Sequence, residues 1–144
     1  MELTIQMESS PAAADILKIQ NELRDFNRRY SSDDNYRSLT IFMRDAEQVL
    51  VGGLLGETYW GWLHISVLWI AEHYRGKGFG KKVLDLAENE AIARGCHSVH
   101  LDTMSFQAVE FYERHGYTTF GVLNDIPVGH SRHFLMKKLG EQNR

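Results

Sequence analysis

The apolar positions of this chain follow two different repeats, which separate expected strands from expected helices. Residues 62–71 form an unusually apolar segment and predict a central strand. Alternation predicts a short first strand at residues 3–7, whereas an apolar stripe at helical spacing predicts a helix at residues 11–29. The other expected elements are strands at residues 39–44, 49–58, 98–103, 117–123 and 133–139 and helices at residues 81–94 and 106–114.

The order of these elements sets the expected fold class. A helix, a strand, a second helix and further strands follow the early strands, which favours an α/β or mixed α+β fold over an all-β one. The chain has 144 residues, 43% of them hydrophobic, and contains no internal repeat or linker. We therefore expect one domain over residues 1–144, large enough to bury a core.

The composition limits the kinds of partner and the cellular compartment that we expect for this protein. A net charge of −3 argues against nucleic acid, because proteins that bind it usually present a basic surface. Cys96 is the single cysteine, so no intrachain disulfide forms, and it is expected to be a small core residue. No apolar run reaches transmembrane length and residues 1–10 lack a signal pattern, which predicts a cytoplasmic protein without membrane attachment.

A glycine-rich segment stands between the apolar strand and the following helix. Residues 75–80 read RGKGFG, and Lys81 and Lys82 follow directly. A strand that ends in such a turn and opens a helix gathers unpaired backbone N–H groups at the positive end of that helix. Glycines also let the backbone approach a ligand closely. Together with the lysines, the pattern favours a pyrophosphate site over a simple connecting turn.

Two familiar phosphate loops fit this segment poorly. A Walker loop needs a Ser or Thr after its Gly-Lys pair, and Lys82 stands there instead. A Rossmann fingerprint needs Gly-x-Gly-x-x-Gly, but the glycines here are Gly76, Gly78 and Gly80. Asp102 ends a later strand at about the 20-residue distance that the dinucleotide fingerprint requires, so spacing alone leaves that alternative open.

The pattern that fits is Arg/Gln-x-x-Gly-x-Gly/Ala, present as Arg75, Gly78 and Gly80. Residues 73–84 (HYRGKGFGKKVL) and 108–117 (AVEFYERHGY) resemble, in this order, the two signature segments of the GCN5-related N-acetyltransferases. The resemblance covers residues 3–139 and implies a mixed, mostly antiparallel central sheet. In this family the sheet is splayed at the strand before the loop and flanked by helices, and acetyl-coenzyme A is the co-substrate.

The resemblance also assigns roles to particular positions. Leu68, Trp69 and Ile70 would contact the pantetheine arm through their main chain, and Gly76, Lys77, Gly78, Phe79, Gly80 and Lys81 would bind the pyrophosphate after Arg75, which begins the motif. Ser105 stands where the family often carries an Asn that contacts the cofactor. Tyr112 is the expected general acid, because a phenol stays protonated until the coenzyme A thiolate needs a proton.

The general base is less determined. In relatives with a carboxylate base on the strand before the loop, that residue corresponds to His64 here, and an imidazole can accept the amine proton directly or through water. Glu57, Tyr59 and Asp102 are the other candidates, and a chain of waters is a further alternative. The histidine spacing matches no zinc pattern, so we expect no metal.

The resemblance implies a primary amine as acceptor, on a small molecule or a peptide, without identifying it. The aromatic residues Tyr59, Trp60 and Trp62 could contact that acceptor or cover a homodimer surface, and the family often pairs through edge strands. Two alternatives come from other classes: a non-catalytic sensor that holds an acyl-coenzyme A, and a dinucleotide-dependent oxidoreductase, which the glycine order disfavours.

Overall fold

The computed structural model describes residues 2–140, which divide into two compact units. The first unit extends to Asp34 and contains helix α1 (Ala13–Arg28), which buries none of its residues. A surface ion pair between Lys18 and Glu22, 3.4 Å apart, lies along this helix. Residues 3–7 form no strand, so that prediction was wrong. A strand needs a hydrogen-bonded neighbour, and residues 2–34 contain no second extended segment assigned as one.

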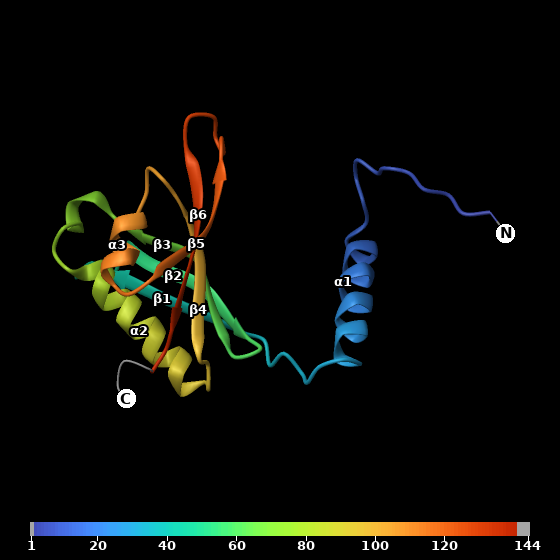
Figure 1. Ribbon diagram of the computed structural model, residues 1–144, viewed down its shortest axis with the longest axis horizontal. Helices are drawn as coiled ribbons and strands as arrows, with labels where there is room; N and C mark the ends of the chain where they lie inside the picture. Colours follow the sequence, from blue (N-terminus) through green and yellow to red (C-terminus); the bar gives the residue numbers. More distant parts are fainter. Residues whose placement is uncertain (1, 141–144) are drawn as a thin grey trace. The chain divides into compact units, whose positions relative to one another are not determined.

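The second unit, from Asn35 onward, is built on a six-stranded sheet (Figure 1). Its strands run in the spatial order β1-β2-β3-β4-β6-β5 and are β1 (Arg37–Arg44), β2 (Leu50–Tyr59), β3 (Trp62–Ile70), β4 (Ser98–Met104), β6 (Ser131–Lys138) and β5 (Thr118–Asn124). Neighbouring strands are antiparallel except for β3 and β4. This confirms the expected mixed, mostly antiparallel sheet with its flanking helices, and each later strand lies within a few residues of its predicted place.

The parallel pair β3 and β4 separates halfway along. Pairing runs from Trp62 opposite Ser98 to Ile65 opposite Leu101 and then stops. At this point β3 also carries an irregularity against β2, because Leu55 pairs with Val67 while Gly56 pairs with Ile65. Ser66 is therefore an extra residue in β3, and such a bulge bends a strand. The second half of β3 thus follows β2 and leaves β4, which produces the splay that the resemblance implied.

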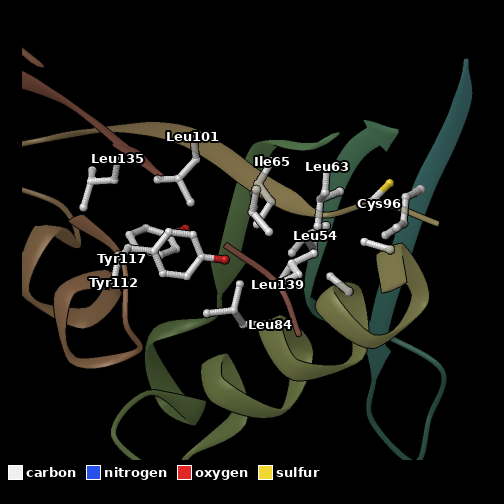
Figure 2. Packing of buried hydrophobic residues seen from close by; sticks show 14 of the residues in the cluster. Leu54, Leu63, Ile65, Leu84, Cys96, Leu101, Tyr112, Tyr117, Leu135 and Leu139 are labelled. Carbon is white, nitrogen blue, oxygen red and sulfur yellow. The ribbon is translucent and has the colours of Figure 1, made fainter. Parts of the chain in front are cut away.

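Helix α2 (Phe79–Ala93) covers one face of this sheet and lies across β1, β2 and β3 (Figure 1). Its apolar side is buried, and Leu84 is completely inaccessible to solvent. Figure 2 shows Leu84 beneath the inward-pointing side chains of the strands. The other fully buried large residues of the core are Leu54, Leu63, Val99 and Leu135. The short elements η1 (Glu72–Tyr74) and α3 (Val109–Arg114) complete the unit.

A buried carboxylate connects α2 to the β5–β6 end of the sheet. The Glu88 carboxylate accepts hydrogen bonds from the Tyr117 hydroxyl at 2.6 Å and from the Lys137 ammonium at 2.8 Å. Burial first, and then the Glu88 carboxylate, raise the pKa of Tyr117 far above its usual value, so the phenol stays a donor. Each oxygen of the Glu88 carboxylate thus has a hydrogen-bond donor, which offsets the cost of burying this group.

The sheet face opposite α2 carries a different set of side chains, which we call the histidine face. Alternation along the strands places these residues on it: Glu57 and Tyr59 of β2, Trp62 and His64 of β3, and His100 and Asp102 of β4. The residues that alternate with these along the strands point into the core; examples are Leu63, Ile65 and Leu101. These three strands therefore supply core residues on one face of the sheet and polar side chains on the other.

Gly56 lies at the irregularity in the pairing of β2 with β3. A Cβ added there would clash with the carbonyl oxygen of His64, which belongs to the backbone and cannot move alone. Gly56→Ala should therefore lower the free energy of unfolding by roughly 1–3 kcal/mol, as overpacking does elsewhere. Gly121→Ala, in β5, is the matched control because its Cβ would meet nothing within 4 Å. Urea unfolding measures both, and equal losses would contradict this close approach.

Candidate active site

The separation of β3 from β4 opens a cavity of about 860 Å³. One wall is the unpaired half of β3, and the opposite wall comes from the end of β4 and from α3. The residues that line it are Ile65, Ser66, Val67, Leu68, Trp69, Ile70, Tyr74, Arg75, Gly76, Gly78, Phe79, Gly80, Lys81, Asp102, Thr103, Phe106, Gln107, Ala108, Phe111, Tyr112, Arg114 and His115. A cavity of this size and composition is typical of sites for small ligands.

The β3 wall presents backbone to this cavity. Beyond Ile65 the strand is paired only with β2, where Leu54 opposes Leu68 and Gly52 opposes Ile70. In an antiparallel pair, every second residue directs its N–H and C=O groups away from the partner strand. Those groups, with no β4 beside them, face the cavity. Leu68, Trp69 and Ile70, predicted to contact pantetheine, all line this wall.

The glycine-rich loop and the start of α2 form one end of the cavity, next to the C-terminal end of β3. Gly76 and Gly78 have φ values of 74° and 85°, a backbone conformation that favours glycine. The first hydrogen bond of α2 runs from the N–H of Lys82 to the carbonyl of Gly78. The N–H groups of the preceding residues 79–81 therefore have no acceptor within the helix. Several backbone donors thus point toward one place at a positive helix end.

Arg75 and Lys81, two of the predicted basic residues, have structural partners. The Arg75 guanidinium donates through Nε to the carbonyl oxygen of Ile70 at 2.7 Å, which ties the loop to the end of β3. The Lys81 ammonium lies 2.6 Å from an Asp85 oxygen one turn further along α2. Both residues line the cavity. Arg75 therefore holds the loop against the end of β3, and Lys81 pairs along its own helix.

Lys77, Ser105 and His64 are predicted site residues that do not line the cavity. Ser105 instead joins the loop after β4 to β6: its N–H donates to the carbonyl of Ser131, and its hydroxyl accepts from the Ser131 N–H. The neighbouring Phe106 and Gln107 do line the cavity, and sequence reasoning missed both. Their place in the short segment between β4 and α3 was the available signal.

Tyr112 lies on α3 where the helix closes the cavity. Only 5% of this residue is exposed, and its ring is 5.4 Å from that of Tyr117, beside it in Figure 2. Burial raises the pKa of Tyr112 to about 12, because the phenolate would lose its hydration. The phenol therefore keeps its proton over the whole physiological range.

His64 and Glu57 form a hydrogen-bonded pair on the histidine face. The Nδ1 atom of His64 is 2.8 Å from the Glu57 Oε1, and about a quarter of each side chain is exposed. The ring of His100 stacks on that of His64, with centroids 4.6 Å apart and planes 19° apart. Ile65 and Ser66, the residues directly after His64, line the cavity. The pair thus lies beside the point where the strands separate.

Asp102, another candidate base, is engaged by a cation. Its Oδ2 accepts from the Arg132 guanidinium Nε at 2.7 Å, across the pairing of β4 with β6. This contact gives Asp102 a structural role, because it joins the ends of β4 and β6. Within residues 2–140, no cluster of three or more His, Cys, Asp or Glu side chains could hold a metal ion. None of the helices described there is long and apolar enough to span a bilayer.

Comparisons with known proteins agree with this geometry. The model of the family described as "Acetyltransferase (GNAT) family" matches residues 6–117. Acetyltransferase Atu2258 of Agrobacterium fabrum is 37% identical over 120 residues, which cover 83% of this chain and 88% of that protein. Blasticidin-S acetyltransferase of Streptomyces morookaense is 40% identical over 91 residues, or 62% of this chain and 67% of that protein.

A solved structure extends the agreement to the fold. The crystal structure of an acetyltransferase from Bacillus cereus superposes with a TM-score of 0.85 at 33% identity, covering 93% of this chain and 98% of its own. The two signature segments, the splayed strand pair and these similarities are mutually consistent. The chain belongs to the GNAT family of acetyltransferases, whose co-substrate is acetyl-coenzyme A.

Proposed function

We propose that this chain is a single-domain N-acetyltransferase that moves the acetyl group of acetyl-coenzyme A to a primary amine. The reaction is direct attack in a ternary complex. One observation carries the proposal: the cavity begins where β3 leaves β4 and ends at the exposed N–H groups of α2. Such a cavity suits a ligand with a long amide-bearing arm and a pyrophosphate, which is the shape of coenzyme A.

The co-substrate is held mainly by backbone. The pyrophosphate lies at the glycine-rich loop and the first N–H groups of α2, and the open space around Gly76 and Gly78 leaves room for it. The pantetheine amides bond the edge of β3 along Leu68, Trp69 and Ile70. The thioester then reaches the point near Ser66 where the strands part.

The transfer itself needs one proton acceptor and one proton donor. The amine nitrogen attacks the thioester carbonyl, a C–N bond forms, and the C–S bond breaks with its electron pair on sulfur. The nitrogen loses its proton to Nε2 of His64, directly or through a water. The thiolate gains a proton from the Tyr112 hydroxyl. Backbone N–H groups of the unpaired half of β3 stabilise the negative charge that develops on the carbonyl oxygen.

The raised pKa of Tyr112 is compatible with this role. A phenol with a pKa of about 12 would be a poor acid toward a thiolate in water. Within the cavity, however, the same loss of hydration raises the pKa of the thiol that forms. The two pKa values therefore rise in the same direction, which offsets part of the gap between the buried phenol and the thiol.

A small-molecule amine is the acceptor that the comparisons favour. One relative is named for blasticidin S, a small molecule, and it shares 40% identity with this chain over 91 residues. The partly exposed aromatic rings of Tyr59 and Trp62 on the histidine face each meet the ring of His100 edge-on, which places two aromatic side chains beside His64. Both observations support a small acceptor with a planar or ring-containing body. A panel of amines that includes a peptide would distinguish a small-molecule acceptor from a peptide acceptor.

The loop assignment predicts a specific effect of Gly78→Ala. An L-residue in the left-handed conformation costs roughly 1–2 kcal/mol. The free loop can relax to avoid that cost, but the bound loop cannot, so acetyl-coenzyme A affinity should fall about tenfold. Gly95→Ala is the matched control, because Gly95 has the same φ of 85° and equally open surroundings at the other end of α2. Calorimetric titration of both variants measures the difference, and equal affinities would refute the loop assignment.

A further inference from the structure

The histidine face contains further hydrogen bonds besides the one between His64 and Glu57, and the chemistry of each partner identifies the donor and the acceptor. We infer that Glu57 and His100 are positioning residues, which hold His64 with its proton on Nδ1 and its lone pair on Nε2, toward the acceptor. This inference rests on the proposed function and deepens it. It assigns a role to two side chains that do not themselves touch the reacting atoms.

Glu57 fixes the tautomer of His64. An ionised carboxylate only accepts hydrogen bonds, so the Nδ1 atom that lies 2.8 Å from Oε1 must carry the proton. The neutral imidazole then has its free lone pair on Nε2. The second oxygen of Glu57 accepts from the Ser66 hydroxyl at 3.5 Å. Ser66 is the bulge residue of β3, so the carboxylate is held at the position where the cavity opens.

Glu57 has a further effect once the proton arrives. When Nε2 takes the proton of the amine, His64 becomes a cation beside a carboxylate, and the pair is a salt bridge in a partly buried place. The carboxylate thus stabilises the protonated base that forms during the reaction, as the buried aspartate does in a serine protease triad. An amide at the same position would accept the same hydrogen bond without this charge.

His100 restricts His64 from the other side. Its ring lies parallel to that of His64, and its Nε2 is 3.0 Å from the Tyr59 hydroxyl. Burial, and then the neighbouring His64, lower the pKa of His100 despite the acidic Glu57 and Asp102. Burial raises the pKa of Tyr59, which therefore remains a donor. His100 consequently stays neutral with Nε2 as acceptor, and its flat uncharged ring keeps His64 in one orientation.

The geometry makes Glu57 and His64 one unit, and a double-mutant cycle tests this. With a primary amine that the wild type acetylates, Glu57→Gln should lower kcat/KM at least about tenfold, with most of the loss in kcat. In a His64→Ala background the same substitution should have little further effect. An equal loss in both backgrounds would overturn the inference, because Glu57 would then act on the acceptor itself. Glu57→Asp, which restores the charge, should recover part of the rate.

A second measurement needs no substrate. NMR shifts of the imidazole nitrogens in the free protein should show His64 with its proton on Nδ1, and Glu57→Ala should produce a mixture of tautomers. Glu47→Gln, an exposed carboxylate in the β1–β2 hairpin, serves as the control and should leave the spectrum unchanged. A wild-type His64 protonated on Nε2 would refute the positioning role. If no amine is acetylated, the proposed function fails, while this spectrum still decides whether Glu57 orients His64.

Discussion

Tyr112→Phe should lower kcat by roughly 10²–10⁴-fold, the usual contribution of a general acid. The KM for acetyl-coenzyme A should change little, because the hydroxyl acts on the sulfur only as the thiolate forms. The ring is 5% exposed and keeps its packing in the variant, so the fold should persist. Steady-state kinetics of coenzyme A release, with one acetylated amine, measures the effect.

Tyr117→Phe is the matched control for this variant. Tyr117 is also a buried tyrosine, with its ring 5.4 Å from Tyr112, but its hydroxyl donates to Glu88. Losing this hydrogen bond to a charged group should cost about 1.5–3 kcal/mol of stability and leave kcat close to that of the wild type. If Tyr112→Phe also retains near wild-type kcat, the thiolate takes its proton from water and not from this residue.

The raised pKa of Tyr112 also predicts how kcat should depend on pH. A tyrosine acts as an acid only while protonated, and burial has raised this pKa to about 12. The protonated form therefore persists as the pH rises through the usual range of the phenol, near 10. Wild-type kcat should show no decline between neutral pH and pH 10 that depends on Tyr112. A descending limb near pH 10 that vanishes in Tyr112→Phe would contradict the burial argument.

His64→Ala should also have a large effect, again roughly 10²–10⁴-fold on kcat/KM near neutral pH. The wild-type profile should rise with pH as the imidazole loses its proton, and this limb should disappear in the variant. The amine can produce a similar limb by its own ionisation, so disappearance on mutation is the diagnostic result.

His97→Ala provides the comparison for His64. His97 also lies near Trp62, but its Nδ1 is 2.9 Å from the Ser98 hydroxyl, and no role in proton transfer follows from its position. Its pH profile should retain the ascending limb. A His64→Ala enzyme with the limb intact would show that water or another group removes the proton.

The cofactor cavity could be predicted from sequence because its chemistry lies in local backbone. Gly76 and Gly78 require a conformation that favours glycine, and the strand before them and the helix after them are both local patterns. The resemblance then supplied the splay between β3 and β4. Its physical origin, the extra residue Ser66, depends on the pairing of β2 with β3, which hydrophobicity alone does not specify.

The histidine face was only partly predictable. Trp60 and Gly61 both have positive φ, as in a type I′ hairpin turn, and such a turn would place Glu57 opposite His64. His64 and Glu57 were each candidates, but their pairing was not inferred. His100 lies beside His64 because β3 and β4 pair in parallel in this register. A helix separates the two strands in the sequence, so the sequence alone does not determine which residues pair. The strand expected at residues 3–7 failed for a related reason, since alternation predicts a strand without supplying a neighbour.

The most direct test of the central claim, acetyl transfer from acetyl-coenzyme A to an amine, is a thiol-release assay with an amine panel. The panel contains blasticidin S, an aminoglycoside, a polyamine and a peptide with a free N-terminus. We predict coenzyme A release that depends on one of these amines, a product heavier by one acetyl group, and a much slower reaction in Tyr112→Phe. Tight binding of acetyl-coenzyme A without amine-dependent thiol release from any member would contradict this account and favour a non-catalytic acyl-coenzyme A sensor.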